Sequence, residues 1–299
     1  MEAGNQIVPI SANVTLVVKR EDLVHPYISG NKFRKLKYNL LEAKSKNHTK
    51  LLTFGGAFSN HISAVAAVGR ELGFETIGII RGEELAGSAN ENPTLQYARQ
   101  CGMRLEFVSR YQYRMKETEV FIESLQQQFG DFYLIPEGGT NALAISGCEE
   151  ILTSEDTIFD YICCAVGTGG TIAGLINSSK PHQHILGFPA LKGSFLQAEI
   201  RKFVRNENWS LISDYHFGGY GKINEELVRF LNTFHQQTGI PLDPIYTGKL
   251  FFGVMDLISK DYFAYGSKIL LIHTGGIQGI KGMNIRLKNI QSPLIEYYD

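Results

Sequence analysis

A glycine-rich loop, AVGTGGTIAGL at residues 165–175, carries the strongest chemical signal in the sequence. An apolar run precedes the loop and an apolar helical pattern follows it. Glycines let the backbone amides turn toward an anion, Thr168 and Thr171 can donate hydroxyl hydrogen bonds, and the start of a helix adds a positive dipole. The segment therefore predicts a phosphate-binding loop, although a tight strand-to-helix turn without a ligand has the same pattern.

The spacing within this loop restricts the kind of phosphate. The dinucleotide pattern G-x-G-x-x-G is not met, because Ile172 stands at the third glycine position after Gly167 and Gly169. The first acidic residue after the loop is Glu199, which is too distant to bind a ribose. The Walker pattern is absent as well. A small cofactor with one phosphate is therefore favoured over a dinucleotide or a nucleoside triphosphate.

Lys32 is the candidate nucleophile. It follows the turn signal Gly30-Asn31 and opens a predicted helix. A lysine at a helix start can point its amine inward, and near a phosphate site such a lysine suggests a Schiff base with a carbonyl cofactor. Taken alone, the same lysine could be a solvated surface amine, which is what we expect of Lys35 and Lys37.

Two further loops contain polar side chains after a predicted strand. In GGAFSNH, residues 55–61, the side chains of Ser59, Asn60 and His61 could contact an anionic substrate or a phenolic oxygen, or could only cap a helix, with Ser59 as the N-cap. In HTGG, residues 273–276, we expect His273 to be structural. The histidines show no metal-ligand spacing, so no metal is expected, and the G-x-S-x-G pattern of a serine nucleophile is absent.

A parallel α/β sheet is expected to position these loops. Short apolar runs alternate with helical patterns, which favours parallel strands covered on both faces, and ligands in such sheets bind beyond the carboxyl ends of the strands. The predicted strands are 16–19, 50–54, 76–80, 104–108, 132–135, 161–166, 184–188 and 268–273. The predicted helices are 33–46, 93–100, 117–129, 142–152, one starting near residue 59 and one starting at residue 171.

Composition limits the partners and the compartment. The chain of 299 residues has 29 basic and 30 acidic residues, so it lacks the basic excess of proteins that bind nucleic acid or anionic membranes. The cysteines form no C-x-x-C pair, and we expect them to be buried in a reducing compartment. They are Cys101, Cys148, Cys163 and Cys164. The most apolar stretch, 161–176, is too short to span a bilayer and no signal peptide is evident, so a cytoplasmic protein is expected.

Taken in order, seven motifs from Val17 to Gly276 resemble one family. They are VKREDLVHPYISGNKFRKLKY, GGAFSNH, PEGGTNALAISG, VGTGGTIAG, GGYGKINEE, DPIYTGKLFFGVMDLI and HTGG. The family is that of the 1-aminocyclopropane-1-carboxylate deaminases and D-cysteine desulfhydrases, which are pyridoxal phosphate enzymes of the tryptophan synthase β-like group. The resemblance implies two open-twisted, parallel-sheet α/β domains (fold type II) with the cofactor in the cleft between them, usually in a homodimer. Residues 1–46 and 142–299 would form the large cofactor-binding domain, and residues 47–141 a smaller α/β domain inserted in it.

The resemblance also implies roles for individual residues. Lys32 would hold pyridoxal phosphate through a Schiff base and move protons at the substrate carbon, and Asn60 would bond the phenolic oxygen of the cofactor. Ser59 and His61 would hold the carboxylate of a small amino-acid substrate or assist proton transfer. The cofactor phosphate would be bound by Gly167, Thr168, Gly169, Gly170 and Thr171.

Other positions match or depart from the family pattern. Tyr220 and Tyr246 match its two active-site tyrosines. Deaminases carry Glu after the second tyrosine and Leu before the last Gly-Gly, where this chain has Thr247 and Thr274, the pattern of the desulfhydrase branch. We assign both threonines to the cofactor site and expect Thr247 to face the pyridine nitrogen, where a hydroxyl need not hold a proton as a carboxylate would. Phe58 replaces the usual Gln.

The segment before Val17 is shorter than usual, which suggests that an edge strand or a substrate lid is missing.

Three functions follow from this pattern. The first is a D-cysteine desulfhydrase-like lyase, which releases pyruvate and ammonia by β-elimination, and sulfide when the substrate is D-cysteine. The second is a 1-aminocyclopropane-1-carboxylate deaminase, which opens the ring to 2-oxobutanoate and ammonia. The third is a non-catalytic protein that binds pyridoxal phosphate, for which only Phe58 argues.

Overall fold

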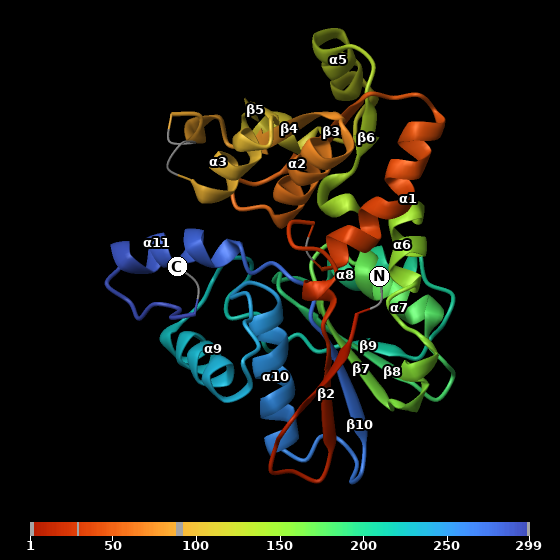
Figure 1. Cartoon of the computed structure of the whole chain (residues 1–299), viewed down its shortest axis with the longest axis vertical. Helices are drawn as coiled ribbons and strands as arrows, with labels where there is room; N and C mark the ends of the chain where they lie inside the picture. The colour runs from red at the N-terminus through yellow and green to blue at the C-terminus, as the bar shows by residue number, and fades with distance from the viewer. Residues whose placement is uncertain (1–2, 29, 88–91, 298–299) are drawn as a thin grey trace.

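The chain forms two sheets stacked along its long axis, as the computed structural model in Figure 1 shows. The structure describes residues 3–28, 30–87 and 92–297. The strands are β1 (Asn5–Val8), β2 (Thr15–Lys19), β3 (Lys50–Gly55), β4 (Glu75–Arg81), β5 (Arg104–Val108), β6 (Tyr133–Ile135), β7 (Tyr161–Val166), β8 (His184–Pro189), β9 (Trp209–Leu211) and β10 (Lys268–Ile272). The α-helices are α1 (Asn31–Ser45), α2 (Asn60–Leu72), α3 (Pro93–Gln100), α4 (Arg110–Arg114), α5 (Glu119–Phe129), α6 (Ala142–Glu149), α7 (Gly170–Ser178), α8 (Phe195–Arg201), α9 (Glu225–Thr238), α10 (Thr247–Ser259) and α11 (Gly279–Asn289).

The six-stranded sheet has the order β1-β2-β10-β7-β8-β9, and all its neighbouring strands are parallel except β1 and β2. Successive side chains of a strand point to opposite faces, and here both faces are covered. Val18 and Leu271 pack against α9 and α10, whereas their neighbours Val17 and Leu270 pack in a second cluster with α7. Burial on both faces explains why these strands are almost continuously apolar.

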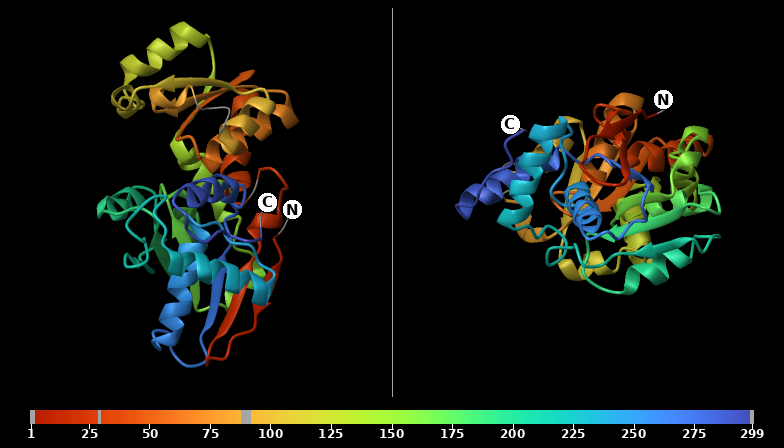
Figure 2. Two further views of the ribbon diagram at one scale, coloured as in Figure 1. Left: turned by 90° about the vertical axis from the view of Figure 1, so that its left-hand side faces the viewer. Right: turned by 90° about the horizontal axis from the view of Figure 1, so that it is seen from below.

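The four-stranded sheet has the order β5-β4-β3-β6 and is parallel throughout. One face packs against α2 and α3, with Leu51 and Ile80 in that cluster. The other face packs against α4 and α5, with Leu52 and Ile79. In the side view of Figure 2 this sheet lies above the six-stranded one, and α5 lies at its far end.

The predicted strand–helix alternation is confirmed. β5, β7 and α3 have the predicted bounds, and the other predicted strands differ by a single residue at one or both ends. All four cysteines are buried and free, as predicted. Within the described part of the chain, no helix is long and apolar enough to cross a membrane.

One prediction about the fold was wrong. An edge strand is present before Val17, because β1 pairs antiparallel with β2 and places Val8 opposite Leu16. The helix predicted over 117–129 is α5, which begins at Glu119 and ends at the predicted residue. The short helix α4 before it was not predicted, and a capping box of Ser109 and Gln112 starts it.

Candidate active site

A cavity of about 1030 Å³ lies between the two sheets, at the carboxyl ends of β3, β6, β7 and β10. The predicted site residues that line it are Lys32, Ser59, Asn60, His61, Gly167, Thr168, Gly169, Thr171, Tyr220, Tyr246 and Thr274. Loops far apart in the sequence therefore meet where parallel sheets bind their ligands.

Lys32 is the second residue of α1, and a glycine fixes where that helix starts. Gly30 has φ +61°, and a Cβ there would lie 1.9 Å from the carbonyl oxygen of Thr274. Only glycine therefore lets α1 begin against the loop after β10. Lys32 donates to Asn31 Oδ1 at 3.0 Å. Burial of the amine, helped by the positive charge of Lys35, lowers the pKa of Lys32 from 10.5 to about 7, so much of the amine is neutral and nucleophilic near neutral pH.

The glycine-rich loop leads directly into α7. Gly169 has φ +87°, and no side chain of a described residue caps the helix. The first amides of α7 therefore have no intrahelical acceptor and are free to bind an anion. A Cβ on Gly167 would lie 3.1 Å from the Tyr246 ring, and one on Gly170 would lie 2.8 Å from Thr140 Oγ1. Larger residues at these positions would therefore fill the space beside the glycine-rich loop. Gly170 itself is not among the residues that line the cavity.

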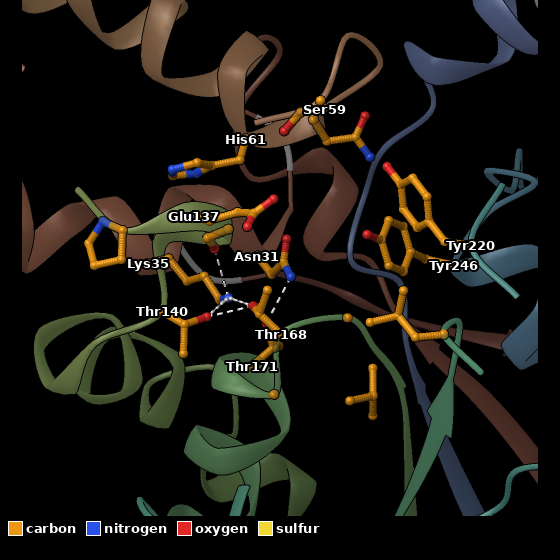
Figure 3. A pocket seen from close by; sticks show the side chains of 18 of the residues that line it. Asn31, Lys35, Ser59, His61, Glu137, Thr140, Thr168, Thr171, Tyr220 and Tyr246 are labelled. Carbon is orange, nitrogen blue, oxygen red and sulfur yellow. Dashed lines mark hydrogen bonds between the residues drawn. The ribbon is translucent and has the colours of Figure 1, made fainter. Parts of the chain in front are cut away.

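Lys35 is not the solvated amine that we predicted. Its residue exposure is 2%, and it points from α1 toward the glycine-rich loop (Figure 3). Its Nζ lies 3.0 Å from Gly138 O and from Thr140 Oγ1, and 3.5 Å from Thr168 Oγ1. Positions i and i+3 share one face of a helix, so the spacing from Lys32 was the available signal. Lys37 is exposed, as predicted, and it pairs with Glu150.

A hydrogen-bond chain connects the start of α1 to the glycine-rich loop. Asn31 Nδ2 donates to Thr171 Oγ1 at 2.8 Å (Figure 3). Thr140 and Thr168 bond each other at 2.6 Å beside the Lys35 ammonium. Asn31 and Thr140 were not singled out from the sequence, although both lie within the quoted motifs GNK and PEGGTN.

The turn after β3 caps α2 and reaches across the cavity. Ser59 Oγ accepts from Ile62 N at 3.3 Å, so the predicted N-cap is confirmed. Asn60 Oδ1 accepts from Gln278 Nε2 at 3.3 Å. Gly276 makes room for the Asn60 amide, because a Cβ there would lie 2.7 Å from Asn60 Nδ2. Asn60 is therefore held between the two sheets.

His61 does not suit the predicted contact with a carboxylate. Thr53 Oγ1 donates to Ile135 O at 2.8 Å, so His61 Nε2 donates to Thr53 in their 2.8 Å pairing. The buried Nδ1 is then an acceptor, with no hydrogen-bond partner among the described residues. Burial and the charges of Lys32 and Lys35 lower the pKa of His61 well below 6.5. A neutral ring that presents a lone pair repels a carboxylate.

The two predicted tyrosines lie together. The rings of Tyr220 and Tyr246 are 6.1 Å apart and edge to face (Figure 3). Burial raises the pKa of both phenols, so they are protonated near neutral pH and can donate. Lys249 Nζ holds the Tyr220 loop by donating to His216 O and Gly219 O, both at 2.9 Å. Because Tyr246 directly precedes α10 and Lys249 lies within it, one helix positions both phenols.

The two predicted threonines differ in position. Thr274 lines the cavity. Thr247 is fully buried and is not among the described residues that line the cavity. Its hydroxyl donates to Asp243 Oδ2 at 2.9 Å and accepts from Asp243 N at 2.8 Å, so it is already occupied.

Asp243 was missed from the sequence, and it orders the start of α10. Its carboxylate accepts from the amides of Ile245, Tyr246 and Thr247. Burial raises its pKa.

Two other residues are placed as follows. His273 is structural, as predicted, because its Nε2 pairs with Pro241 O at 2.6 Å. Phe58 is 44% exposed at the cavity wall. Its ring packs on α11, where a Cβ on Gly282 would lie 2.8 Å away. Phe58 therefore bridges the turn after β3 and α11.

Comparisons with known proteins extend over most of the chain. A family model described as pyridoxal-phosphate dependent enzyme matches residues 6–275. A protein of Pyrococcus horikoshii named "Putative 1-aminocyclopropane-1-carboxylate deaminase" is 35% identical, over 88% of this chain and 84% of that protein. The mitochondrial bifunctional D-cysteine desulfhydrase/1-aminocyclopropane-1-carboxylate deaminase of Arabidopsis thaliana is 32% identical, over 89% of this chain and 73% of that protein.

Solved structures share the arrangement of both sheets. The crystal structure of an ACC deaminase homologue has a TM-score of 0.82 and 31% identity, covering 97% of this chain and 94% of that one. The O-acetylserine dependent cystathionine beta-synthase from Helicobacter pylori has a TM-score of 0.68 at 16% identity, covering 93% and 94%, which is a likeness of fold alone. The predicted fold class is confirmed.

Proposed function

Because the chain belongs to the pyridoxal-phosphate dependent enzyme family, in the group of 1-aminocyclopropane-1-carboxylate deaminases and D-cysteine desulfhydrases, we propose that it is a lyase that eliminates the β-substituent of a small D-amino acid. D-Cysteine is the expected substrate, and its elimination yields pyruvate, sulfide and ammonia. One observation carries the proposal. The Lys32 amine, with a pKa of about 7, shares a cavity with a glycine-rich helix start and two protonated phenols.

The residues of the cavity fit pyridoxal phosphate. The free amides at the start of α7 and the Lys35 ammonium suit a phosphate, the Lys32 amine suits an aldehyde, and the Asn60 amide suits a phenolic oxygen. When bound, the cofactor supplies an electron sink for the negative charge that develops at the α-carbon of the substrate.

Lys32 is the proposed base. The Lys32 amine, when it is free, would take the α-proton of the substrate, because a base with a pKa near the reaction pH is both neutral and strong enough. The free amides at the start of α2, beside Ser59, suit the substrate carboxylate.

The tyrosines are the proposed acids. A thiolate that leaves the β-carbon gains negative charge, and a protonated phenol can donate to it. Tyr220 and Tyr246 both keep their protons near neutral pH and both line the cavity. Their edge-to-face contact fixes the two hydroxyls relative to each other.

The neutral side chain of Thr274 favours elimination over ring opening. Thr274 lines the cavity and presents a hydroxyl, whereas Thr247 is buried outside the cavity with its hydroxyl bonded to Asp243. Thr274 supplies no carboxylate that would hold a proton on a ring nitrogen. A weaker electron sink suffices when a thiolate leaves readily, whereas opening an unactivated cyclopropane ring needs a stronger one.

Steady-state kinetics test the proposal. We expect kcat/KM for D-cysteine, measured by pyruvate release, to exceed that for 1-aminocyclopropane-1-carboxylate, measured by 2-oxobutanoate release. A clear preference for the cyclopropane acid would indicate the deaminase. Loaded protein that turns over neither compound, nor any of a panel of D-amino acids, would indicate a non-catalytic binder.

The domain division and assembly remain part of the proposal. We propose that residues 47–141 form a small domain inserted between 1–46 and 142–299. The four-stranded sheet, which contains only β3 to β6, supports this division. We also propose a homodimer that acts on a small amino acid, and sedimentation equilibrium of the purified protein tests the assembly.

A further inference from the structure

Arg81 is a cation on the cavity wall without a carboxylate partner. It is the last residue of β4, it is exposed, and its side chain lines the cavity. Within the described ranges, its guanidinium forms no ion pair and no hydrogen bond. It lies over the ring of Tyr113, whose centroid is 5.7 Å from Cζ.

The other cations on the outer part of the wall are neutralised. Their carboxylate partners lie 2.7–3.5 Å away: Arg110 pairs with Glu84, Lys202 with Glu199, and Lys116 with Glu117 and Glu137. Deeper in the cavity, Lys32 and Lys35 are assigned to the cofactor. Arg81 is therefore the positive charge that neither a carboxylate nor the proposed cofactor site uses.

Arg81 lies on the cavity wall beside the turn after β3. A Cβ on Gly56 would lie 3.7 Å from Arg81 Nη2, which places the guanidinium over the turn that leads to Ser59. The positive charge of Arg81 also acts on Tyr220, where it partly opposes the rise in pKa caused by burial. Arg81 is therefore close to the turn before α2, and its charge is felt at Tyr220.

We propose that Arg81 binds a negatively charged group on the substrate side chain, so that D-amino acids with an anionic β-substituent are substrates in addition to D-cysteine. This inference rests on the proposed lyase function and extends its range of leaving groups. A guanidinium presents a fork of N–H donors that matches carboxylate, phosphate and sulfonate oxygens. The α-carboxylate is already served by α2, so the charge that Arg81 meets is a second one.

The reaction balances for such substrates. The α-proton leaves, the bond between Cβ and the substituent breaks with its electron pair going to the substituent, and water hydrolyses the resulting enamine to pyruvate and ammonia. With O-phospho-D-serine the released substituent is phosphate, and with D-cysteine it is sulfide. No oxidant or reductant is needed.

Paired substrates and paired variants test the inference on the loaded enzyme. We expect wild-type kcat/KM to be higher for O-phospho-D-serine than for the neutral O-acetyl-D-serine. Arg81→Gln should lower kcat/KM for O-phospho-D-serine about 10–100-fold, as loss of a charge-assisted contact predicts. It should change kcat/KM for O-acetyl-D-serine less than about threefold. Arg110→Gln is the matched control because Arg110 is an arginine of the same wall that is already paired with Glu84. It should leave both values within about twofold.

Binding of non-eliminable ligands gives a second readout. Calorimetric titration should show tighter binding of D-aspartate than of D-asparagine, which has nearly the same shape without the charge. Arg81→Gln should abolish that difference and Arg110→Gln should keep it.

Three results would overturn the inference. These are equal binding of the two amino acids by wild type, an equal effect of Arg81→Gln on charged and neutral ligands, and no effect of Arg81→Gln on either. The proposed lyase function fails separately, if the wild-type enzyme turns over no D-amino acid at all while the binding difference persists.

Discussion

Replacing Lys35 by Met should weaken the binding of pyridoxal phosphate without removing the proposed attachment site, Lys32. The Lys35 ammonium is buried and lies 3.5 Å from Thr168 in the glycine-rich loop. Met is an unbranched side chain of similar length and fills the same space, but it carries no charge and donates no hydrogen bond. The substitution therefore removes the cation while keeping most of the packing.

The structure sets the size of the expected effects. One hydrogen bond to a charged group contributes about 1.5–3 kcal/mol, so losing the contact between Lys35 and a phosphate should raise the dissociation constant about 10–100-fold. The free energy of unfolding should change less than the binding of the cofactor. Thr140 and Thr168 lose the ammonium donor but still bond each other at 2.6 Å, whereas the carbonyl of Gly138 loses its ammonium donor without such a replacement. The free energy of unfolding should fall by about 1–3 kcal/mol.

Equilibrium dialysis against pyridoxal phosphate measures the first effect. The comparison is cleanest in a Lys32→Ala background, where covalent attachment is absent and the dissociation constant reports the phosphate contacts. Lys37→Met is the matched control on the same helix, because Lys37 has a 41% exposed side chain in a solvent-facing pair with Glu150. It should change the dissociation constant less than about twofold. If Lys35→Met folds and binds the cofactor as tightly as the control, the assignment of Lys35 to the phosphate is wrong.

Three further expectations concern the fold, the nucleophile and the tyrosine loop. Gly30→Ala should lower the free energy of unfolding in urea by more than about 2 kcal/mol, because φ is +61° and the new Cβ would overlap a backbone carbonyl, whereas Gly4→Ala, in open space, should be neutral. The rate at which cofactor-free protein attaches pyridoxal phosphate should rise with pH, be half-maximal at about 7 and then level off, because Lys32 attacks only when neutral; a rise continuing to pH 10 would contradict the lowered pKa. Lys249→Met should reduce kcat/KM for D-cysteine about 10–100-fold by releasing the loop of Tyr220, with partial rescue by Lys249→Arg, and unchanged kinetics in a folded variant would refute the positioning role.

Local patterns in the sequence were enough to predict most of the strands and several of the loops. Apolar runs bounded by glycine gave nearly every parallel strand, since a strand buried on both faces is apolar throughout. The Ser59 cap and the glycine-rich loop depend on neighbours within a few residues, and both are as predicted. The pairing of Tyr220 with Tyr246 came from the family resemblance, because no local period connects the two.

What the sequence did not predict depends on distant contacts. The amine of Lys35 is held by the carbonyl of Gly138, 103 positions away, and the local sequence signalled only that Lys35 shares a helix face with Lys32. Thr247 turns from the cavity because Asp243 bonds its hydroxyl in the turn before α10. The helices α8 to α11 and the short strand β9 were not predicted, although α9 is clearly amphipathic, with Leu227, Leu231 and Phe234 buried on one face.

Identifying the lysine that carries the cofactor tests most directly whether the site is built around the start of α1. The loaded protein is reduced with borohydride, digested and mapped by mass spectrometry. We predict that the pyridoxyl group is found on Lys32, both in wild type and in Lys35→Met, and that Lys32→Ala carries none while still binding some cofactor through the glycine-rich loop. A pyridoxyl group on Lys35, Lys37 or any other lysine of the wild-type protein would contradict this assignment.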